Sequence, residues 1–154
     1  MNEAEIRVFV EGVMRYFERV TGEPAAVETP FIKGEQPIGL DYTGVIGISG
    51  RQRGAVFFTS DSALLAKILE SVGEPEIDGA AMADLVGEVA NTISGNARKF
   101  YGHDFQITVP AVIQGSEEQV TLPGKAKELV IPVLWKGLRC YLIVCLESSP
   151  ALVA

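Results

Sequence analysis

The sequence predicts an α+β domain with one mainly antiparallel sheet of about six strands and three helices packed on it. Three observations lead to this prediction. Apolar residues recur at helical spacing in three stretches, residues 2–21, 61–72 and 79–101. The other apolar runs are strand-sized, and several are joined by short turns rather than by crossover helices. With 154 residues, of which 47% are hydrophobic and 21% charged, the chain can build one sizeable core.

The bulk composition bounds the class of protein. No low-complexity stretch interrupts the sequence, so we expect one domain over residues 1–147 with a frayed tail at 148–154. The formal net charge is -7 and no cluster of Lys and Arg occurs, which argues against a nucleic-acid partner. The acidic start and the lack of a membrane-length apolar run favour a cytoplasmic protein without membrane contact. Cys140 and Cys145 would point to opposite faces of one strand and remain reduced thiols.

The first helix is predicted over residues 2–21. Asn2 can cap its start, and Gly22 followed by Pro24 marks its end. Its apolar stripe is predicted to consist of Ile6, Phe9, Val10, Val13, Phe17 and Val20.

Two further helices follow in the middle of the chain. One is predicted over residues 61–72, with Ser60 or Asp61 as its cap and Gly73 beyond its end. The other, over residues 79–101, is the longest helix that the pattern predicts.

Apolar, β-rich runs between and after the helices predict the strands. Lys136-Gly137 is a candidate tight turn between the last two of them. Pro110, Pro123 and Pro132 interrupt three strands, and each is expected at an edge, an end or a bulge because proline cannot donate to a ladder. Long apolar sheet edges favour pairing with a second copy, so we expect a homodimer. The predicted strands cover residues 27–33, 40–49, 54–59, 105–115, 118–124, 129–135 and 138–147.

Polar residues form a narrow stripe along the third helix. Since an α-helix turns about 100° per residue, Glu88 lies at about 40° and Asn91 at about 340° when Asp84 is set at zero. Gly95 falls in the same stripe, at about 20°. Spacing alone leaves open whether this is simply the solvated face of the helix. The opposite, core-facing side would consist of Leu85, Val86, Val89, Ala90, Ile93, Ala97 and Phe100.

Gly95 gives this stripe a second possible use. A glycine within an exposed stripe lets another backbone approach closely, which suits the docking of a partner. The alternatives are that Gly95 fits against a neighbouring helix of the same chain or merely ends a turn.

The motif of Asp84, Glu88 and Asn91, followed by Pro110 in a strand, resembles the signature of the CheC/CheX chemotaxis phosphatases. The segments "NTISGNARKF", "ITVPAVIQG" and "GAVFFTSDSALLAKIL" and the opening helix are also similar to that family. The resemblance extends over about residues 3–147. Because the motif occurs once, the chain is most similar to the CheX type, which acts as a dimer.

This resemblance implies a phosphatase that removes phosphate from the aspartyl phosphate of a CheY-type response regulator. In that role Asn91 orients the attacking water, Glu88 pairs with a lysine of the receiver domain, and Asp84 tunes the docking edge. For Asp84, an acid that simply favours the start of a helix is an equal alternative. The receiver would supply the aspartate, the lysine and a bound Mg²⁺, so this chain is expected to hold no cofactor and no metal.

Two other functions remain open from the sequence. The domain could be a non-catalytic dimeric adaptor or scaffold that binds a receiver domain or a flagellar switch component. A small-molecule sensor is a third possibility, without a pocket signature to support it.

Other kinds of site find no support. His103, the only histidine, follows the third helix, and no His, Cys and carboxylate set has metal-ligand spacing. "GVIGISGRQRG" lacks the lysine-serine pair of a phosphate loop, so a hairpin is favoured there. No serine lies in a G-x-S-x-G nucleophile elbow.

Overall fold

The computed structural model describes residues 1–36, 38–115 and 127–148. Its helices are α1 (Glu3–Thr21), α2 (Ser62–Ser71) and α3 (Gly79–Tyr101). Its strands are β1 (Ala26–Val27), β2 (Phe31–Ile32), β3 (Tyr42–Ser49), β4 (Gln52–Ser60), β5 (Gln106–Ile107), β6 (Ala111–Gln114), β7 (Leu129–Trp135) and β8 (Leu138–Ser148).

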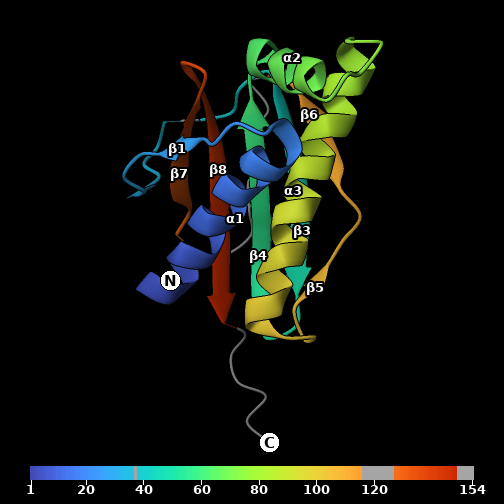
Figure 1. Cartoon of the computed structure of the whole chain (residues 1–154). Helices are drawn as coiled ribbons and strands as arrows, with labels where there is room; N and C mark the ends of the chain where they lie inside the picture. The colour runs from blue at the N-terminus through green and yellow to red at the C-terminus, as the bar shows by residue number, and fades with distance from the viewer. Residues whose placement is uncertain (37, 116–126, 149–154) are drawn as a thin grey trace, which may run out of the picture.

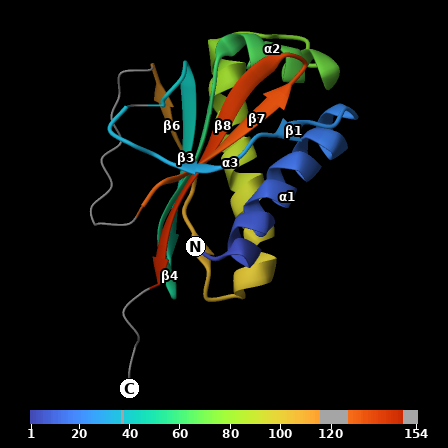
Figure 2. The same ribbon diagram turned by 90° about the vertical axis from the view of Figure 1, so that its left-hand side faces the viewer.

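In the described part of the chain the strands form one antiparallel sheet, with the helices on one of its faces (Figures 1 and 2). The order across the sheet is β1-β7-β8-β4-β3-β5. β2 also pairs with β7, and β6 also pairs with β3, so each edge position is filled by two short strands in succession. The sheet is therefore eight strands by count but six positions wide, and the predicted α+β architecture is confirmed.

The start of α1 follows the sequence prediction. The Asn2 side chain accepts a hydrogen bond from the Glu5 backbone N–H at 2.9 Å, and the Asn2 N–H donates to Glu5 Oε1 at 3.2 Å. This reciprocal capping box satisfies two amides that the helix itself cannot. Gly22, with a φ of 77°, adopts the left-handed conformation that ends the helix.

The start of α2 differs in detail from the prediction. Asp61 occupies the N-cap position, but its side chain makes no capping hydrogen bond. The Asp41 carboxylate, from the segment before β3, accepts from the Ser62 N–H at 2.9 Å instead. Asp41, which is distant in sequence, thus accepts the hydrogen bond at the helix start that the sequence predicted for a local capping residue.

The buried stripe of α1 differs from the prediction at its end. Val20 is 38% exposed, whereas Tyr16, which was not predicted to face inward, is only 4% exposed. Tyr16 follows Val13 by three residues and Phe9 by seven, so it also fits the helical period.

Each proline that the structure describes in a predicted strand lies where no ladder donor is needed. Residues 105–115, predicted as one strand, form β5 and β6 with Pro110 in the break between them. Pro132 lies inside β7, beside the gap between β1 and β2. Its carbonyl accepts from the Glu28 N–H at 3.0 Å. The predictions for Pro123 and for the strand at 118–124 fall outside the described residues, as does nearly all of the predicted frayed tail.

The hairpin from β7 to β8 has the predicted tight turn. Lys136 and Gly137 have φ values of 49° and 75°, the positive pair that a two-residue hairpin of the primed type requires. Trp135, just before this turn, is 2% exposed and donates from Nε1 to the Glu23 carbonyl at 3.2 Å, so it belongs to the core of the monomer.

The core has two parts because both faces of the central sheet are covered. The larger lies between the sheet and the helices, and the smaller lies on the other face, with Ile38 packed against Ala55, Phe57, Val130 and Ile143.

Both cysteines of β8 are buried. Burial raises the pKa of the Cys145 thiol to about 11, and the pKa of Cys140 rises for the same reason. Neither is joined in a disulfide, as predicted. No helix within the described ranges is both long and apolar enough to cross a bilayer.

Candidate functional site

Glycine lets α3 lie directly on the sheet. A Cβ atom at Gly44 of β3 would lie 2.2 Å from the Val86 carbonyl oxygen of α3, closer than any real contact. At the start of α3, the Asp78 side chain accepts from the Ala81 N–H at 2.9 Å. The helix is therefore held at its N-terminal cap and along its backbone, which makes it a rigid base for exposed side chains.

Asp84, Glu88 and Asn91 all lie on the exposed side of α3, as the helical arithmetic predicted. Phe100 was predicted to face the core, and this is wrong, because it is 51% exposed. In the last turn Tyr101 points inward instead and stacks on Phe105 with 4.7 Å between ring centroids. The buried residues of the helix are Leu85, Val86, Gly87, Val89, Ala90, Ile93, Ser94 and Ala97.

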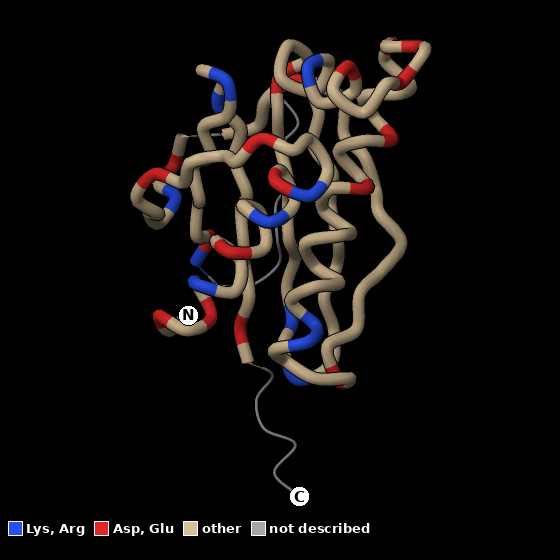
Figure 3. The backbone as a smooth tube through the Cα atoms, in the orientation of Figure 1, with Lys and Arg blue, Asp and Glu red and all other residues tan. Residues whose placement is uncertain are grey.

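The three polar side chains have no partner among the residues that the structure describes. Neither a hydrogen bond nor an ion pair to a described residue is made by Asp84, Glu88 or Asn91. Arg98 and Lys99, the cations of α3, lie in its last turn, so the first five turns carry only negative charge (Figure 3). The stripe thus offers two carboxylates and a carboxamide that are free to engage another molecule.

Pro110 and Val112 flank this stripe on one side. A Cβ atom at Gly87 would lie 3.3 Å from Pro110 Cβ and 3.4 Å from Val112 Cγ2. Gly87 is the residue before Glu88 and lies one turn before Asn91, so the proline that follows the motif in sequence lies beside it in space. Val109, in the same connection, is 86% exposed.

Gly95 lies at the C-terminal end of the stripe and, among the described residues, has no close neighbour outside its own helix. It is half-buried, yet no described atom outside its immediate surroundings in α3 lies within 4 Å of the position that a Cβ would take. The alternative that Gly95 fits against a neighbouring helix is therefore wrong for the described part of the chain. Its predicted role in partner binding stays a prediction.

Tyr16 of α1 lies near enough to Glu88 for the two groups to interact electrostatically. Burial raises the pKa of the Tyr16 phenol well above its usual value, and the negative charge of Glu88 raises it further. Sequence reasoning missed this residue because Tyr16 and Glu88 are 72 positions apart. Only the packing of α1 on α3 brings them together.

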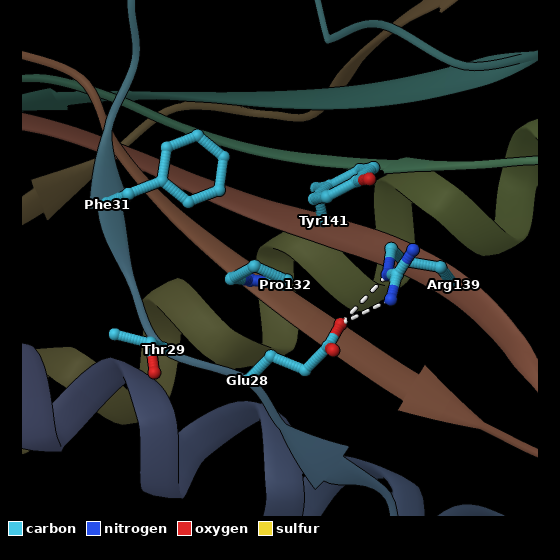
Figure 4. Close-up of a pocket in the computed structure, with 6 residues that line it drawn as sticks. All are labelled: Glu28, Thr29, Phe31, Pro132, Arg139 and Tyr141. Carbon is cyan, nitrogen blue, oxygen red and sulfur yellow. Dashed lines mark hydrogen bonds and ion pairs between the residues drawn. The ribbon is translucent and has the colours of Figure 1, made fainter.

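A separate recess lies on the other face of the sheet, away from α3 (Figure 4). It has a volume of about 380 Å³. Its one cation, Arg139, already donates from Nε and Nη2 to Glu28 Oε1, each at 2.8 Å. Its charged groups are thus satisfied within the chain, unlike those of the stripe. The residues that line it are Glu28, Thr29, Phe31, Pro132, Arg139 and Tyr141.

Metal binding has no support in the described residues, where no group of three or more His, Cys, Asp and Glu side chains could hold an ion. The predicted Mg²⁺ on a receiver partner stays a prediction.

Residues 42–134 match the model of the family described as "Chemotaxis phosphatase CheX". This match covers more than half of the chain and includes the whole α3 stripe and Pro110. No protein with a curated description matches the chain.

Solved structures with the same fold include several proteins of this kind. A CheC-like superfamily protein from Shewanella sp. PV-4 has a TM-score of 0.83 and 22% identity, covering 96% of this chain and all of that one. A chemotaxis protein CheX from Desulfovibrio desulfuricans has a TM-score of 0.82 and 26% identity, covering 94% of this chain and 99% of that one. The CheX-CheY-BeF₃-Mg²⁺ complex from Borrelia burgdorferi has a TM-score of 0.77 and 18% identity, covering 94% and 98%.

Proposed function

This chain belongs to the CheX family of chemotaxis phosphatases, and we propose that it hydrolyses the aspartyl phosphate of a CheY-type response regulator in the cytoplasm. The observation that carries the proposal is the pair of Glu88 and Asn91, exposed and unpaired within the described chain, on one stripe of a rigid helix. The similar fold of a CheX solved in complex with CheY supports the choice of partner.

In the proposed reaction a water attacks the phosphorus of the acyl phosphate. The bond between phosphorus and the aspartate oxygen breaks, which releases inorganic phosphate and the receiver's carboxylate. The receiver's own Mg²⁺ and lysine neutralise charge on the phosphoryl group. The Asn91 carbonyl accepts a hydrogen bond from the water, and its NH₂ group can donate to a phosphoryl oxygen. Orientation of this kind can lower the barrier by several kcal/mol, and it requires no covalent intermediate on this chain.

Glu88 has a different part in the proposal. Its carboxylate pairs with the receiver lysine and so holds α3 over the phosphorylated site. A charge-assisted hydrogen bond of this kind strengthens when water is excluded. Pro110 and Val112, which lie beside the stripe at Gly87, would help to exclude it. Asp84 and Gly95 lie at the two ends of this docking stripe.

Replacing Asn91 tests the proposal directly. A CheY-type receiver is phosphorylated with a small-molecule phosphodonor in the presence of Mg²⁺, and release of inorganic phosphate is followed with and without this protein. We expect the protein to accelerate release and Asn91→Ala to lower kcat on the order of 100-fold, the usual cost of losing one orienting group. Glu88→Gln should chiefly raise KM, because it weakens docking.

Gln106→Ala is the matched control, since it removes another exposed amide on β5, outside the stripe. It should leave the rate unchanged. If Asn91→Ala is as fast as the unmodified protein, Asn91 does not orient the water. If the receiver binds but its phosphate lifetime does not change, the chain is an adaptor rather than an enzyme.

We also propose that the working form is a homodimer. Phe31 and Ile32 of β2 are 45% and 53% exposed, and β2 lies at an edge of the described sheet. Two neighbouring apolar residues that are both exposed on an edge strand favour pairing with a second copy.

A further inference from the structure

The packing of α1 on α3 follows one antiparallel register. In Figure 1, α1 rises from the N-terminus while α3 descends from α2. At the lower end the Tyr101 hydroxyl donates to Glu5 Oε2 at 2.8 Å. Midway, a Cβ at Gly12 would lie 3.6 Å from Ile93 Cγ2. Each step forward along α1 is therefore matched by about one step backward along α3.

Extending this register brings Tyr16 to the level of Glu88. Tyr16 lies four residues beyond Gly12, or about 6 Å along α1, and Glu88 lies five residues before Ile93, or about 7.5 Å back along α3. Burial raises the Tyr16 pKa, and the Glu88 charge raises it further, which agrees with this placement. The phenol consequently keeps its proton across the physiological range and can act only as a neutral donor or acceptor.

The Tyr16 hydroxyl is positioned to serve a group outside the core. Its ring is buried, with 4% of the residue exposed. Among the described residues, Ser94 Oγ is the one buried side-chain nitrogen or oxygen without a hydrogen-bond partner. The Tyr16 hydroxyl makes no hydrogen bond with a described residue either, so its oxygen is not sealed in the core and keeps some contact with solvent. The buried Tyr16 ring thus holds its hydroxyl, a free hydrogen-bond donor, at the level of Glu88.

We propose that Tyr16 is a positioning residue that donates a hydrogen bond to the Glu88 carboxylate when the receiver docks. This inference rests on the proposed function and deepens it. An exposed glutamate samples many rotamers, and fixing one of them costs conformational entropy. A phenol held by the core offsets part of that cost because it offers a preset donor. One carboxylate oxygen accepts from Tyr16 and the other remains for the receiver lysine.

Tyr16→Phe is the test, because it keeps the buried ring and removes only the hydroxyl. We expect KM for the phosphorylated receiver to rise about tenfold, the effect of losing a hydrogen bond to a charged group, with kcat little changed. The dissociation constant for a receiver domain loaded with BeF₃⁻ and Mg²⁺, measured by calorimetry, should rise by the same factor. The matched control is Tyr101→Phe, which removes a phenol hydroxyl at the other end of the same helix pair.

A double-mutant cycle separates positioning from packing. If Tyr16 acts through Glu88, Tyr16→Phe costs no further affinity in a Glu88→Gln background. If the ring matters only for packing, Tyr16→Phe retains the KM and the dissociation constant of the unmodified protein, and the inference is overturned. The inference is also overturned if the losses of affinity in Tyr16→Phe and Glu88→Gln simply add in the double variant.

These results are distinguishable from failure of the proposed function. If Asn91→Ala loses activity but Tyr16→Phe leaves KM and the dissociation constant unchanged, only this inference is overturned. A protein that never accelerates phosphate release sinks the proposed reaction, while the binding cycle still decides the role of Tyr16.

Discussion

At the level of single residues, the candidate site depends on polar side chains without partners in the described chain and on glycines without a Cβ atom. Glu88 and Asn91 are functional candidates because they lack partners in the described chain. Gly44 and Gly87 matter because they lack a Cβ atom, which lets α3 approach β3 on one side and Pro110 on the other. The two glycines allow α3 to lie close to the sheet, and the position of α3 in turn directs Glu88 and Asn91 outward.

Gly44→Ala should therefore destabilise the fold strongly. The new Cβ would lie 2.2 Å from a backbone oxygen, which cannot rotate away as the tip of a side chain could. We expect a loss of about 2–3 kcal/mol or more in the free energy of unfolding, measured by urea denaturation. Gly34→Ala is the control, because no described atom lies within 4 Å of its Cβ position. Equal stability of the two variants would contradict the close approach of α3 to β3.

At the scale of elements, α3 combines a helix of 23 residues with two interior glycines. Glycine weakens a helix interior relative to alanine by up to about 1 kcal/mol. At Gly87 the contact with Pro110 and Val112 explains why no larger residue is present. At Gly95 no contact within the described chain does so, and docking of a partner is the reason that we propose.

Gly95→Ala consequently separates stability from function. The variant should raise the free energy of unfolding by about 0.5–1 kcal/mol, since alanine fits the helix and meets no neighbour. It should also raise the dissociation constant for the BeF₃⁻-loaded receiver several-fold if a partner backbone approaches there. Greater stability with unchanged receiver binding would remove Gly95 from the docking surface.

At the scale of the whole molecule, the two sheet edges differ in what lies beside them. The edge formed by β5 and β6 adjoins the α3 stripe, whereas the edge formed by β1 and β2 lies across the sheet from it (Figure 1). A second copy that pairs along β2 would leave the stripe accessible. One surface can then serve assembly while the other serves a receiver.

We therefore expect Ile32→Lys to weaken the proposed homodimer by tenfold or more. A charge on an exposed apolar edge strand opposes pairing with another chain. Sedimentation equilibrium should give twice the chain mass for the unmodified protein and a shift toward monomer for the variant. Val72→Lys, which changes another exposed apolar residue at the end of α2, should leave the mass unchanged. An unmodified protein that is monomeric at tens of micromolar would contradict the assembly.

The local features of this protein could be predicted from its amino-acid sequence. The three helices, their principal ends, the hairpin turn at Lys136 and the outward direction of Asp84, Glu88 and Asn91 all follow from patterns within a few residues. Such patterns are readable because helix geometry repeats every 3.6 residues and because caps and turns need particular side chains.

Which distant residues lie near one another at the stripe depends on how the helices and strands pack. Pro110 reaches Gly87 through the break between β5 and β6, and the register of α1 on α3 brings Tyr16 near enough to Glu88 for its charge to raise the Tyr16 pKa further after burial. The inward turn of Tyr101 in place of Phe100 was set in the same way, by stacking on Phe105. No local period encodes these contacts, because they arise from the way whole elements pack when they bury their apolar faces together.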